Sequence, residues 1–396
     1  MTMLSDLTQD LVEEILSKVP ITSLGAVRCT CKGWNALSKN RILCKGEPKH
    51  QFLGFMMKKY KLFSIKFDQH GVLYEDSDEE FVKPSIKEIG NFINHVKISQ
   101  IYHCDGLLLC VTMDNSRLVI WNPYLGQTKW IHLKTRTRST YALGYDKNKN
   151  KNHKILKFFN NNQGYYEIYD VKSSSWRTFT VIPKWDIDCD KLGESVDGNT
   201  YFWTRERRVA EGYASDDPYF LICFDFTAEI FGKFHFLPFG SRNFSCVKEE
   251  KLAALYQQCH TSMIEVWITT KIVPDDVSWT LFLRVDIKPL VGLDFHFYEN
   301  SCFFIDVEKK LAVVFDLAES DIYKTTNSYI IGDKEYLKKV THGKFKAFHA
   351  PLVCSSCYAP SLVQIDDPIA RRERNRKWKS NIKEWKRMKR NKTQQR

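Results

Sequence analysis

A loose internal repeat places the strongest constraint on the fold of this chain. An aromatic residue, a polar or acidic residue, a turn and a second aromatic recur as Trp121-Asn122 with Trp130, Tyr169-Asp170 with Trp176, Phe224-Asp225 with Phe231, Trp267 with Trp279, and Phe315-Asp316 with Tyr323. The first aromatics lie 48, 55, 43 and 48 residues apart. A period of this length with several short strands per unit is typical of the blades of a β-propeller.

Each repeat predicts the same local arrangement. We expect the aromatic nearest the turn to fill the seam between two blades, and the Asp or Asn to cap the turn through its own backbone. Under this hypothesis Trp121, Trp130, Asp170 and Trp176 are structural residues. A string of unrelated hairpins in a sandwich is the alternative that the repeat leaves open.

Short strands are expected throughout residues 50–365, where no long amphipathic helix is evident. Aromatic residues make up 14% of the 396 residues, which favours strands because flat rings pack on a pleated surface. Residues 52–67 alternate and precede a turn at His70-Gly71. Hairpins are expected where apolar runs flank turn signals, at 107–111 with 117–121, 155–159 with 165–169, and 302–306 with 311–317.

The N-terminal segment has the different periodicity of short helices. Its first apolar stripe recurs every four residues and is widened by two more positions, giving Leu7, Leu11, Val12, Ile15, Leu16 and Val19. Pro20 ends this helix, and Thr22 or Ser23 can cap a second one. The second stripe consists of Leu24, Val27, Cys31, Trp34 and Leu37. A unit of about 40 residues lies near the lower limit for independent folding, so it needs a partner surface.

This segment resembles the F-box. The matching residues are Leu7, Asp10-Leu11, Glu14-Ile15-Leu16, Pro20, Ser23-Leu24, Arg28-Cys29-Thr30-Cys31-Lys32 and Trp34, with Thr8 where the family usually has proline. Thr can cap the first helix in its place. The resemblance implies docking onto a Skp-type adaptor and, through it, onto a cullin-based SCF ubiquitin ligase. The residues expected to form or support the adaptor-binding surface are Leu7, Leu11, Ile15, Leu16, Pro20, Leu24, Arg28, Cys31, Lys32, Trp34 and Leu37.

The region that follows resembles the type 1 F-box-associated domain of plants. The matching pieces come in family order and include HCDGLLLC at 103–110, VIWNPYLGQTKWI at 119–131, ALGYD at 142–146, YEIYDVKSSSWRTF at 166–179, DGNTYFW at 197–203, FDFTAEIFG at 224–232, IEVWITTKI at 264–272 and SYIIG at 328–332. The resemblance implies a kelch-like interaction domain that holds the substrate destined for ubiquitination. The double-glycine repeat of kelch proteins is missing, which leaves the number of blades open.

The net charge of +12 is a property of the C-terminal tail. Residues 371–396 hold 13 Lys or Arg against Glu373 and Glu384, a net of +11, so the other 370 residues carry a net of only +1. A basic face for nucleic acid across a whole domain is thereby disfavoured. Within the tail, Trp378, Ile382, Trp385 and Met388 would form one apolar stripe on a helix.

Three interpretations of the tail stay open. It could be a solvated end without fixed structure, a nuclear-import signal, or a docking helix for an acidic surface or a calmodulin-like groove. The candidate import residues are Lys386, Arg387, Lys389 and Arg390. The expected location is therefore the nucleus, the cytoplasm or both.

The search for chemistry finds no catalytic residues, no cofactor and no metal site. Motifs for a nucleophile elbow, a phosphate-binding loop or a zinc helix are missing. Cys354 and Cys357 have the spacing of half a zinc site but lack a second pair, so strand-end thiols are the expectation. His103 and Cys104 are adjacent on a strand and should point to opposite faces. The twelve cysteines follow no compact framework and are expected to be reduced and mostly buried.

Two more features complete the search. The acidic run at 75–80 is expected to be a solvated loop, although it could bind a cation or a basic partner. No apolar run is long enough to span a membrane, so a soluble intracellular protein without a membrane partner is expected.

The sequence as a whole predicts a mainly β protein with a small all-α F-box at the N-terminus. The expected parts are an F-box at 1–44, a linker at 45–51, a β-propeller-like domain of short antiparallel strands at 52–368 and a basic tail, helical in one interpretation, at 369–396. The function expected is that of a non-catalytic substrate receptor of an SCF ligase, with a Skp-type adaptor, a cullin and an unknown protein substrate as partners. A scaffold outside a ligase and an enzyme built on a propeller are the alternatives. Substrate contacts are expected from loops at 146–164, 182–192 and 205–218.

Overall fold

The structure is a computed structural model, which describes most of the β region and seven residues before it. The described residues are Thr8, Leu11, Val12, Ile15, Leu16, Val27, Trp34, 51–58, 60–68, 85–89, 96–148, 151–159, 164–188, 191–206, 219–237, 243–257, 261–291, 297, 301–319, 323–333, 337–346, 353–355 and 358–365.

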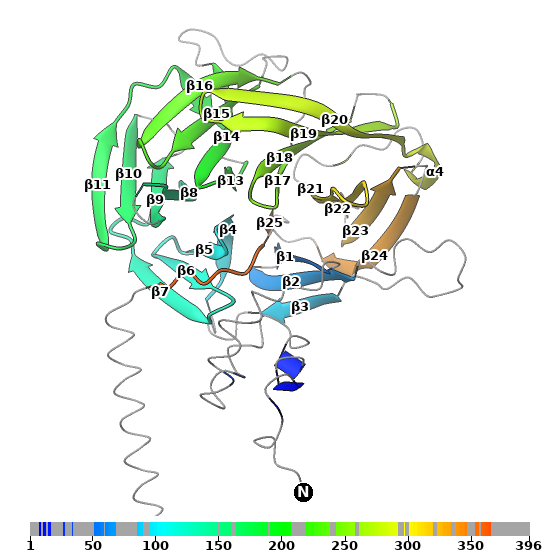
Figure 1. The fold of residues 1–396 in the computed structure, drawn as a ribbon, viewed down its shortest axis with the longest axis horizontal. Helices are drawn as coiled ribbons and strands as arrows, with labels where there is room; N and C mark the ends of the chain where they lie inside the picture. The colour runs from blue at the N-terminus through cyan, green and yellow to red at the C-terminus, as the bar shows by residue number, and fades with distance from the viewer. Residues whose placement is uncertain are drawn as a thin grey trace, which may run out of the picture.

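Six antiparallel sheets stand around a common centre and form a six-bladed β-propeller, seen down its axis in Figure 1. Blade 1 consists of β25 (Val353–Ser355), β1 (Gln51–Lys58), β2 (Lys61–Asp68) and β3 (Ser85–Ile89). Blade 2 consists of β4 (Ile98–Cys104), β5 (Leu107–Thr112), β6 (Arg117–Asn122) and β7 (Gln127–His132). Blade 3 consists of β8 (Ser139–Asp146), β9 (Asn152–Phe159), β10 (Tyr165–Asp170) and β11 (Ser175–Thr180).

The other three blades repeat this order, with one interruption. In blade 4 the innermost position is shared by β12 (Trp185–Ile187) and β13 (Glu194–Val196), and the outer strands are β14 (Asn199–Glu206), β15 (Phe220–Asp225) and β16 (Ile230–Phe236). Blade 5 consists of β17 (Asn243–Val247), β18 (Lys251–Gln257), β19 (Met263–Val273) and β20 (Asp276–Asp286). Blade 6 consists of β21 (Cys302–Asp306), β22 (Leu311–Glu319), β23 (Tyr323–Gly332) and β24 (Leu337–Lys346).

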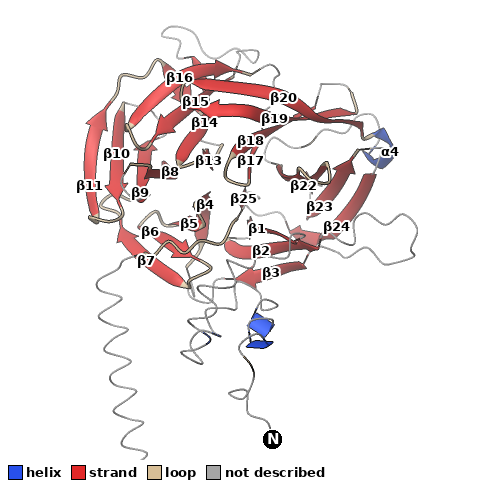
Figure 2. Ribbon diagram, in the orientation of Figure 1, coloured by secondary structure: helices blue, strands red, loops and turns tan. Residues whose placement is uncertain are grey.

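The fold class predicted from the sequence is confirmed, and the structure supplies the number of blades. Strands dominate the described residues in Figure 2, where α4 (Lys288–Val291) is the single short helix of the described propeller. The alternating residues 52–67 form two strands joined at Tyr60, because Tyr60 takes a φ of 62° and turns the chain back.

The ring closes by joining the two ends of the propeller sequence in blade 1. The innermost strand of that blade, β25, comes from the C-terminal end, while its three outer strands come from the N-terminal end. Phe55 pairs with Ser355 and Met57 with Val353. Closure therefore rests on contacts between residues that lie about 300 positions apart in the sequence.

After β25 the chain crosses blade 2 as a short segment, residues 358–365, which we call the C-terminal strap. Tyr358 is 5% exposed and its ring lies 4.8 Å from that of Phe55. The Asn122 side chain donates hydrogen bonds to the carbonyls of Ser361 and Val363, at 2.9 and 2.8 Å. Figure 1 shows the strap in orange-red running past β6 toward β7.

Apolar residues fill the seams between neighbouring blades. The cluster between blades 2 and 3 contains Leu109, Ile120 and Tyr141, all fully buried. The seam between blades 3 and 4 is strongly aromatic, with Phe158 packed edge-on against Phe202. Each blade is one small sheet, so these seams supply the core that a single blade lacks.

The repeat noted in the sequence marks the outer hairpin of blades 2 to 5. In blades 2 to 4 the polar residue caps the turn as predicted: Asn122 accepts from the Leu125 N–H, Asp170 from that of Ser173, and Asp225 from those of Thr227 and Ala228. The preceding aromatics Trp121, Tyr169 and Phe224 are buried in successive seams.

The second aromatic residues of these repeats lie beside the seams. Trp130 and Trp176 are partly buried and pack against the seams, and the rings of Tyr169 and Trp176 lie 5.0 Å apart. These positions agree with the structural roles predicted for Trp121, Trp130, Asp170 and Trp176.

The fifth member of the repeat was assigned to the wrong hairpin. Phe315-Asp316 and Tyr323 lie on β22 and β23, the second and third strands of blade 6, whereas the other members lie on third and fourth strands. Asp316 is fully buried within the sheet and caps no turn there. The matching pair in blade 1, Phe67-Asp68, ends its third strand, and the sequence analysis missed it although Tyr74 follows Phe67 by seven residues, the spacing of Tyr169 with Trp176.

The cysteines agree with the expectation in part. Cys104, Cys110, Cys223 and Cys246 are buried free thiols. Cys302 takes part in a disulfide bond, so the prediction that all thiols are reduced was wrong for this residue.

Candidate interaction surfaces

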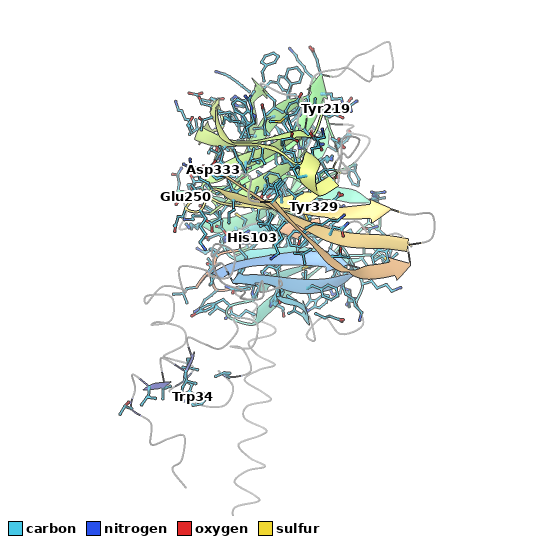
Figure 3. All side chains as sticks on the ribbon, turned by 90° about the vertical axis from the view of Figure 1, so that its right-hand side faces the viewer. Trp34, His103, Tyr219, Glu250, Tyr329 and Asp333 are labelled. Carbon is cyan, nitrogen blue, oxygen red and sulfur yellow. The ribbon has the colours of Figure 1, made fainter. Side chains whose placement is uncertain are left out.

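The propeller has two unlike faces, which follow from the direction of its strands. The turns between first and second strands and between third and fourth strands lie on one face, which we call the turn face. The connections between second and third strands and between successive blades lie on the other, which we call the loop face. In Figure 3, Glu250 marks the turn face and Tyr219 lies toward the loop face.

Both ends of the propeller sequence lie on the turn face. Gln51 starts β1 beyond the pairing of Phe55 with Ser355, so the first residue of β1 lies on this face. The C-terminal strap also crosses this face, because a Cβ added at Gly106 would lie 2.4 Å from that of Ser361. The loop face is opposite both.

A hydrogen-bonded bridge spans the centre of the ring on the turn face. Glu249 of blade 5 places its Oε1 3.0 Å from Nε2 of His103 and accepts from the Gly106 N–H at 3.1 Å, and both partners belong to blade 2. The His103 side chain is 6% exposed. Because blades 2 and 5 are opposite each other in a ring of six, this contact ties the two halves of the turn face together.

The turn that carries Glu249 has an unfavourable backbone. Lys248 and Glu249 have φ values of 49° and 58°, and the Glu250 N–H donates to the Val247 carbonyl, as in a type I′ turn. Such turns prefer Asn-Gly or Asp-Gly, and blade 2 uses Asp105-Gly106 at the equivalent place. A non-glycine pair in this conformation persists only where surrounding contacts hold it, here the bridge to His103 and Gly106.

Ion pairs join neighbouring blades around the same face. Asp105 of blade 2 lies 3.0 Å from Lys151 and 3.2 Å from His153 of blade 3, and these two partners hold the pKa of Asp105 below its usual value against the effect of burial. Lys147 of blade 3 pairs with Asp197 of blade 4. These charged residues of the turn face are thus engaged with one another, which suits a scaffold.

His103 and Cys104 do not form a catalytic pair. The His103 ring faces Glu249, whereas Cys104 lies in the apolar seam between blades 2 and 3. Burial raises the pKa of the Cys104 thiol well above its usual value, so the reactive thiolate is disfavoured. Among the described residues no group of three or more His, Cys, Asp or Glu could hold a metal ion. No helix in the described part of the chain is long and apolar enough to cross a membrane.

The loop face has longer connections and more exposed apolar groups. Tyr165, Ile182 and Phe236 are 59%, 94% and 76% exposed at the ends of strands in blades 3 and 4. Deeper in the seam between blades 4 and 5, Trp203 stacks on Phe244 with ring centres 4.0 Å apart. Exposed apolar residues at one end of a rigid scaffold commonly form an interaction surface.

The predicted substrate loops divide between the two faces. Within 146–164, Lys147, Asn148 and Lys151 lie on the turn face and β9 occupies Asn152–Phe159, so the prediction of one long loop was wrong. The segment 182–192 lies on the loop face and contains β12. Residues 207–218 lie outside the described part of the chain, and Arg205 and Glu206 still belong to β14.

The N-terminal helix buries one pair of residues and exposes another. Val12 and Leu16 are 6% and 1% exposed, whereas Leu11 and Ile15 are 49% and 40% exposed. The Val12 N–H donates to the carbonyl of Thr8, which is itself outside the helix, so Thr8 has the backbone position of an N-cap. Val27 and Trp34 are helical and half-buried.

Other predicted site residues lie outside the described part of the chain. These are Leu7, Pro20, Leu24, Arg28, Cys31, Lys32 and Leu37 of the adaptor surface and Lys386, Arg387, Lys389 and Arg390 of the tail. Sequence reasoning had missed the Asp105-Gly106 and Asp197-Gly198 turns, which the preference of type I′ turns for Asp-Gly could have found. It also had missed the exposed basic segment at 132–138, because charge was summed over the whole body.

Comparison with known proteins agrees with this architecture. The F-box domain family matches residues 4–46 and the F-box associated beta propeller domain family matches residues 53–365. An F-box/kelch-repeat protein of Arabidopsis thaliana is 60% identical over 384 residues, covering 94% of this chain and 94% of the relative. An F-box protein of the same plant is 56% identical over 394 residues, covering 95% of this chain and 97% of the relative. The chain therefore belongs to the family of F-box proteins that carry an F-box-associated β-propeller domain.

Proposed function

We propose that this protein is the substrate-recognition subunit of an SCF-type cullin ubiquitin ligase. Residues 1–44 would bind a Skp-type adaptor and, through it, the cullin, while the propeller at 52–368 would hold the target protein. The observation that carries the proposal is the exposed apolar pair Leu11 and Ile15 on the helix of an F-box that precedes a rigid six-bladed scaffold. The chain itself would be non-catalytic, since its contribution is to hold a target near a charged conjugating enzyme.

The F-box helix separates a folding role from a docking role. Val12 and Leu16 are buried, so their apolar area already stabilises the domain. Leu11 and Ile15 lie one turn apart and leave about half of their surface to solvent. Burial of two such side chains in an adaptor groove would contribute about 1–2 kcal/mol each.

Adaptor binding is the first test. In the full chain, Leu11→Ala with Ile15→Ala should abolish co-purification of a Skp-type adaptor and leave the melting temperature nearly unchanged. Val273→Ala with Leu281→Ala is the matched control, because these two residues of blade 5 are 43% and 39% exposed. Wild-type adaptor recovery by the Leu11 and Ile15 double variant would refute the docking surface.

Ligase activity separates this proposal from a scaffold role outside a ligase. The full chain would be assembled with adaptor, cullin and conjugating enzyme, and ubiquitin transfer to bound proteins would be measured. A receptor should support transfer that depends on Leu11 and Ile15. An assembly that forms but transfers no ubiquitin to any protein held by the propeller would favour the scaffold.

The location of the protein has a separate test in the basic tail. We propose that Lys386, Arg387, Lys389 and Arg390 act as a nuclear-import signal, because the charge of the tail is independent of the nearly neutral body. A fluorescent fusion of the full chain should be at least partly nuclear, and replacement of the four residues with Ala should shift it to the cytoplasm. An unchanged distribution would leave the tail without this role.

A further inference from the structure

A basic segment on the loop face presents three exposed cationic side chains. Residues 132–138, with the sequence HLKTRTR, connect β7 of blade 2 with β8 of blade 3. Leu133 packs against the seam between these blades, while Lys134, Arg136 and Arg138 are all exposed. We call these three residues the basic ridge. They lie in a body whose net charge is only +1 over residues 1–370.

The sequence of the ridge places its cations at alternate positions of the segment, with a bend at Lys134. The hydroxyls of Thr135 and Thr137 lie 3.4 Å apart, so these two side chains lie together. Thr135 also lies 3.4 Å from Nζ of Lys157 in blade 3. The cations Lys134, Arg136 and Arg138 alternate with these threonines along the segment.

Acidic groups beside the ridge are engaged elsewhere. Both carboxylate oxygens of Asp114 accept from hydroxyls, those of Thr112 and Ser116, and these hydrogen bonds hold the pKa of Asp114 well below its usual value. Glu167 is held at 2.6 Å by Lys157. A further cation stands next to the ridge, since the Arg117 guanidinium lies 4.9 Å from the Trp130 ring and Arg117 pairs with His132 across the strands. With Arg117 and Lys157, the three cations of the ridge outnumber the carboxylates of Asp114 and Glu167 by five to two.

Two exposed apolar side chains flank the ridge on blade 3. Tyr165 and Ile182 are 59% and 94% exposed, and their segments are adjacent because the Val181 N–H donates to the Gly164 carbonyl at 2.9 Å. The strands β8, β9 and β10 are neighbours, and Ser139 and Tyr165 lie at their loop-face ends. Two strand spacings put Tyr165 about 10 Å from the end of the ridge.

We propose that the basic ridge, with Tyr165 and Ile182 beside it, is the docking surface for an extended acidic segment of the target protein. The segment would carry anionic side chains, carboxylate or phosphoserine, at alternate positions, next to a bulky apolar residue. This inference rests on the proposed function and names the class of target that the receptor selects. The loop face suits a target because both the first residue of β1 and the C-terminal strap lie on the opposite face.

Binding of defined peptides tests the proposal. The full chain, co-expressed with a Skp-type adaptor, would be titrated against fluorescent peptides of alternating Asp and Ser that end in Leu-Phe, against the same peptides with Asn or with phosphoserine in place of Asp, and against a single-stranded oligonucleotide of equal charge. The Asp or phosphoserine peptide should bind and the Asn peptide should not. Lys134→Ala/Arg136→Ala/Arg138→Ala should weaken binding about tenfold, and added salt should weaken the wild type further.

A matched control and a charge exchange complete the design. Lys172→Ala/Lys251→Ala/Lys310→Ala removes the same charge from exposed lysines of the turn face and should leave peptide affinity unchanged. Lys134→Glu/Arg136→Glu/Arg138→Glu should lose the Asp peptide and gain a peptide with Lys at the same alternate positions.

Three outcomes would overturn the proposal: no discrimination between Asp and Asn peptides, equal affinity in the wild type and the triple alanine variant, or tighter binding of the oligonucleotide, which would make the ridge a nucleic-acid surface. Recovery of the adaptor, measured in every sample, reports on the proposed function separately. Retained adaptor without peptide discrimination refutes the ridge alone, whereas a wild-type chain that fails to recover adaptor refutes the receptor.

Discussion

The two faces of the propeller are built from the same strands but differ in what their residues contact. On the turn face, short turns are capped by Asn122, Asp170 and Asp225, and charged residues of neighbouring blades pair with one another. On the loop face, the basic ridge and Ile182 are turned toward solvent. The contacts that hold the ring and the residues available to a partner thus lie at opposite ends of the same strands. Because each strand is continuous, contacts that fix it on the turn face also fix the position of its end on the loop face.

The largest expected effect is at the C-terminal strap. Tyr358→Ala should destabilise the protein by about 3–5 kcal/mol, because it removes a buried ring that packs on Phe55 in the blade that closes the propeller. Leu362→Ala in the same strap is the control, since Leu362 is 47% exposed. The urea midpoint should fall strongly for Tyr358→Ala and hardly at all for Leu362→Ala. Equal decreases in the two variants would contradict a specific stabilising role of the buried Tyr358 ring.

The next effect concerns the side chain that fastens the strap. Asn122 is fully buried, donates to two strap carbonyls and accepts from the Leu125 N–H. Asn122→Ala should cost about 2–3 kcal/mol, because it leaves buried polar groups without partners. Asn122→Asp tests the donors separately: it keeps the acceptor for Leu125 and should be nearly as damaging. A mild Asp variant would show that the turn cap, and not the strap, accounts for the loss.

A smaller and opposite effect is expected at Glu194 of β13, near the turn face. Burial raises the pKa of Glu194 to about 8, although the backbone N–H of Cys246 opposes the shift. The carboxyl is ionised in the unfolded chain above about pH 4.3 but protonated in the fold up to about pH 8, so stability falls as pH rises between these values.

Glu194→Gln should therefore raise stability at pH 7 by about 1–3 kcal/mol and flatten its pH dependence from pH 5 to 8. Thermal melts of both proteins across this range check the prediction. If the stability of Glu194→Gln depended on pH in the same way as that of the wild type, Glu194 would be ionised in the folded protein. Glu194 would then not be a destabilising residue near the turn face.

The smallest effect is expected on the loop face. Lys134→Ala/Arg136→Ala/Arg138→Ala should change the free energy of unfolding by no more than about 0.5 kcal/mol per site, because the three side chains are exposed. Chemical denaturation measures this directly. A strongly destabilised variant would make the ridge a structural element and break the contrast between the two faces.

Much of the fold could be predicted because its signals are local. An aromatic followed by Asn or Asp at a turn specifies a hairpin wherever it stands, so the outer hairpins of blades 2 to 4 were found with their caps. The same reasoning failed at Phe315-Asp316, since the sequence pattern does not distinguish an Asp buried within a sheet from an Asp that caps a turn. The apolar stripe of the F-box helix was visible too, but its division into buried Leu16 and exposed Leu11 depends on how the helix packs.

By itself the sequence determined the amphipathic N-terminal helices, the β character of the body and a repeat of blade length, since periodicity and turn chemistry act over a few residues. The F-box was identified through the resemblance of its residue pattern to that family. Only the tertiary structure decided that the ring has six blades, that β25 closes it against β1, and that Glu249 reaches across to His103. It also decided which charged side chains are exposed, as on the basic ridge, and which are buried, as Lys157 is beside Glu167. Contacts between residues this far apart in the chain depend on the closure of the whole ring, which no local pattern encodes.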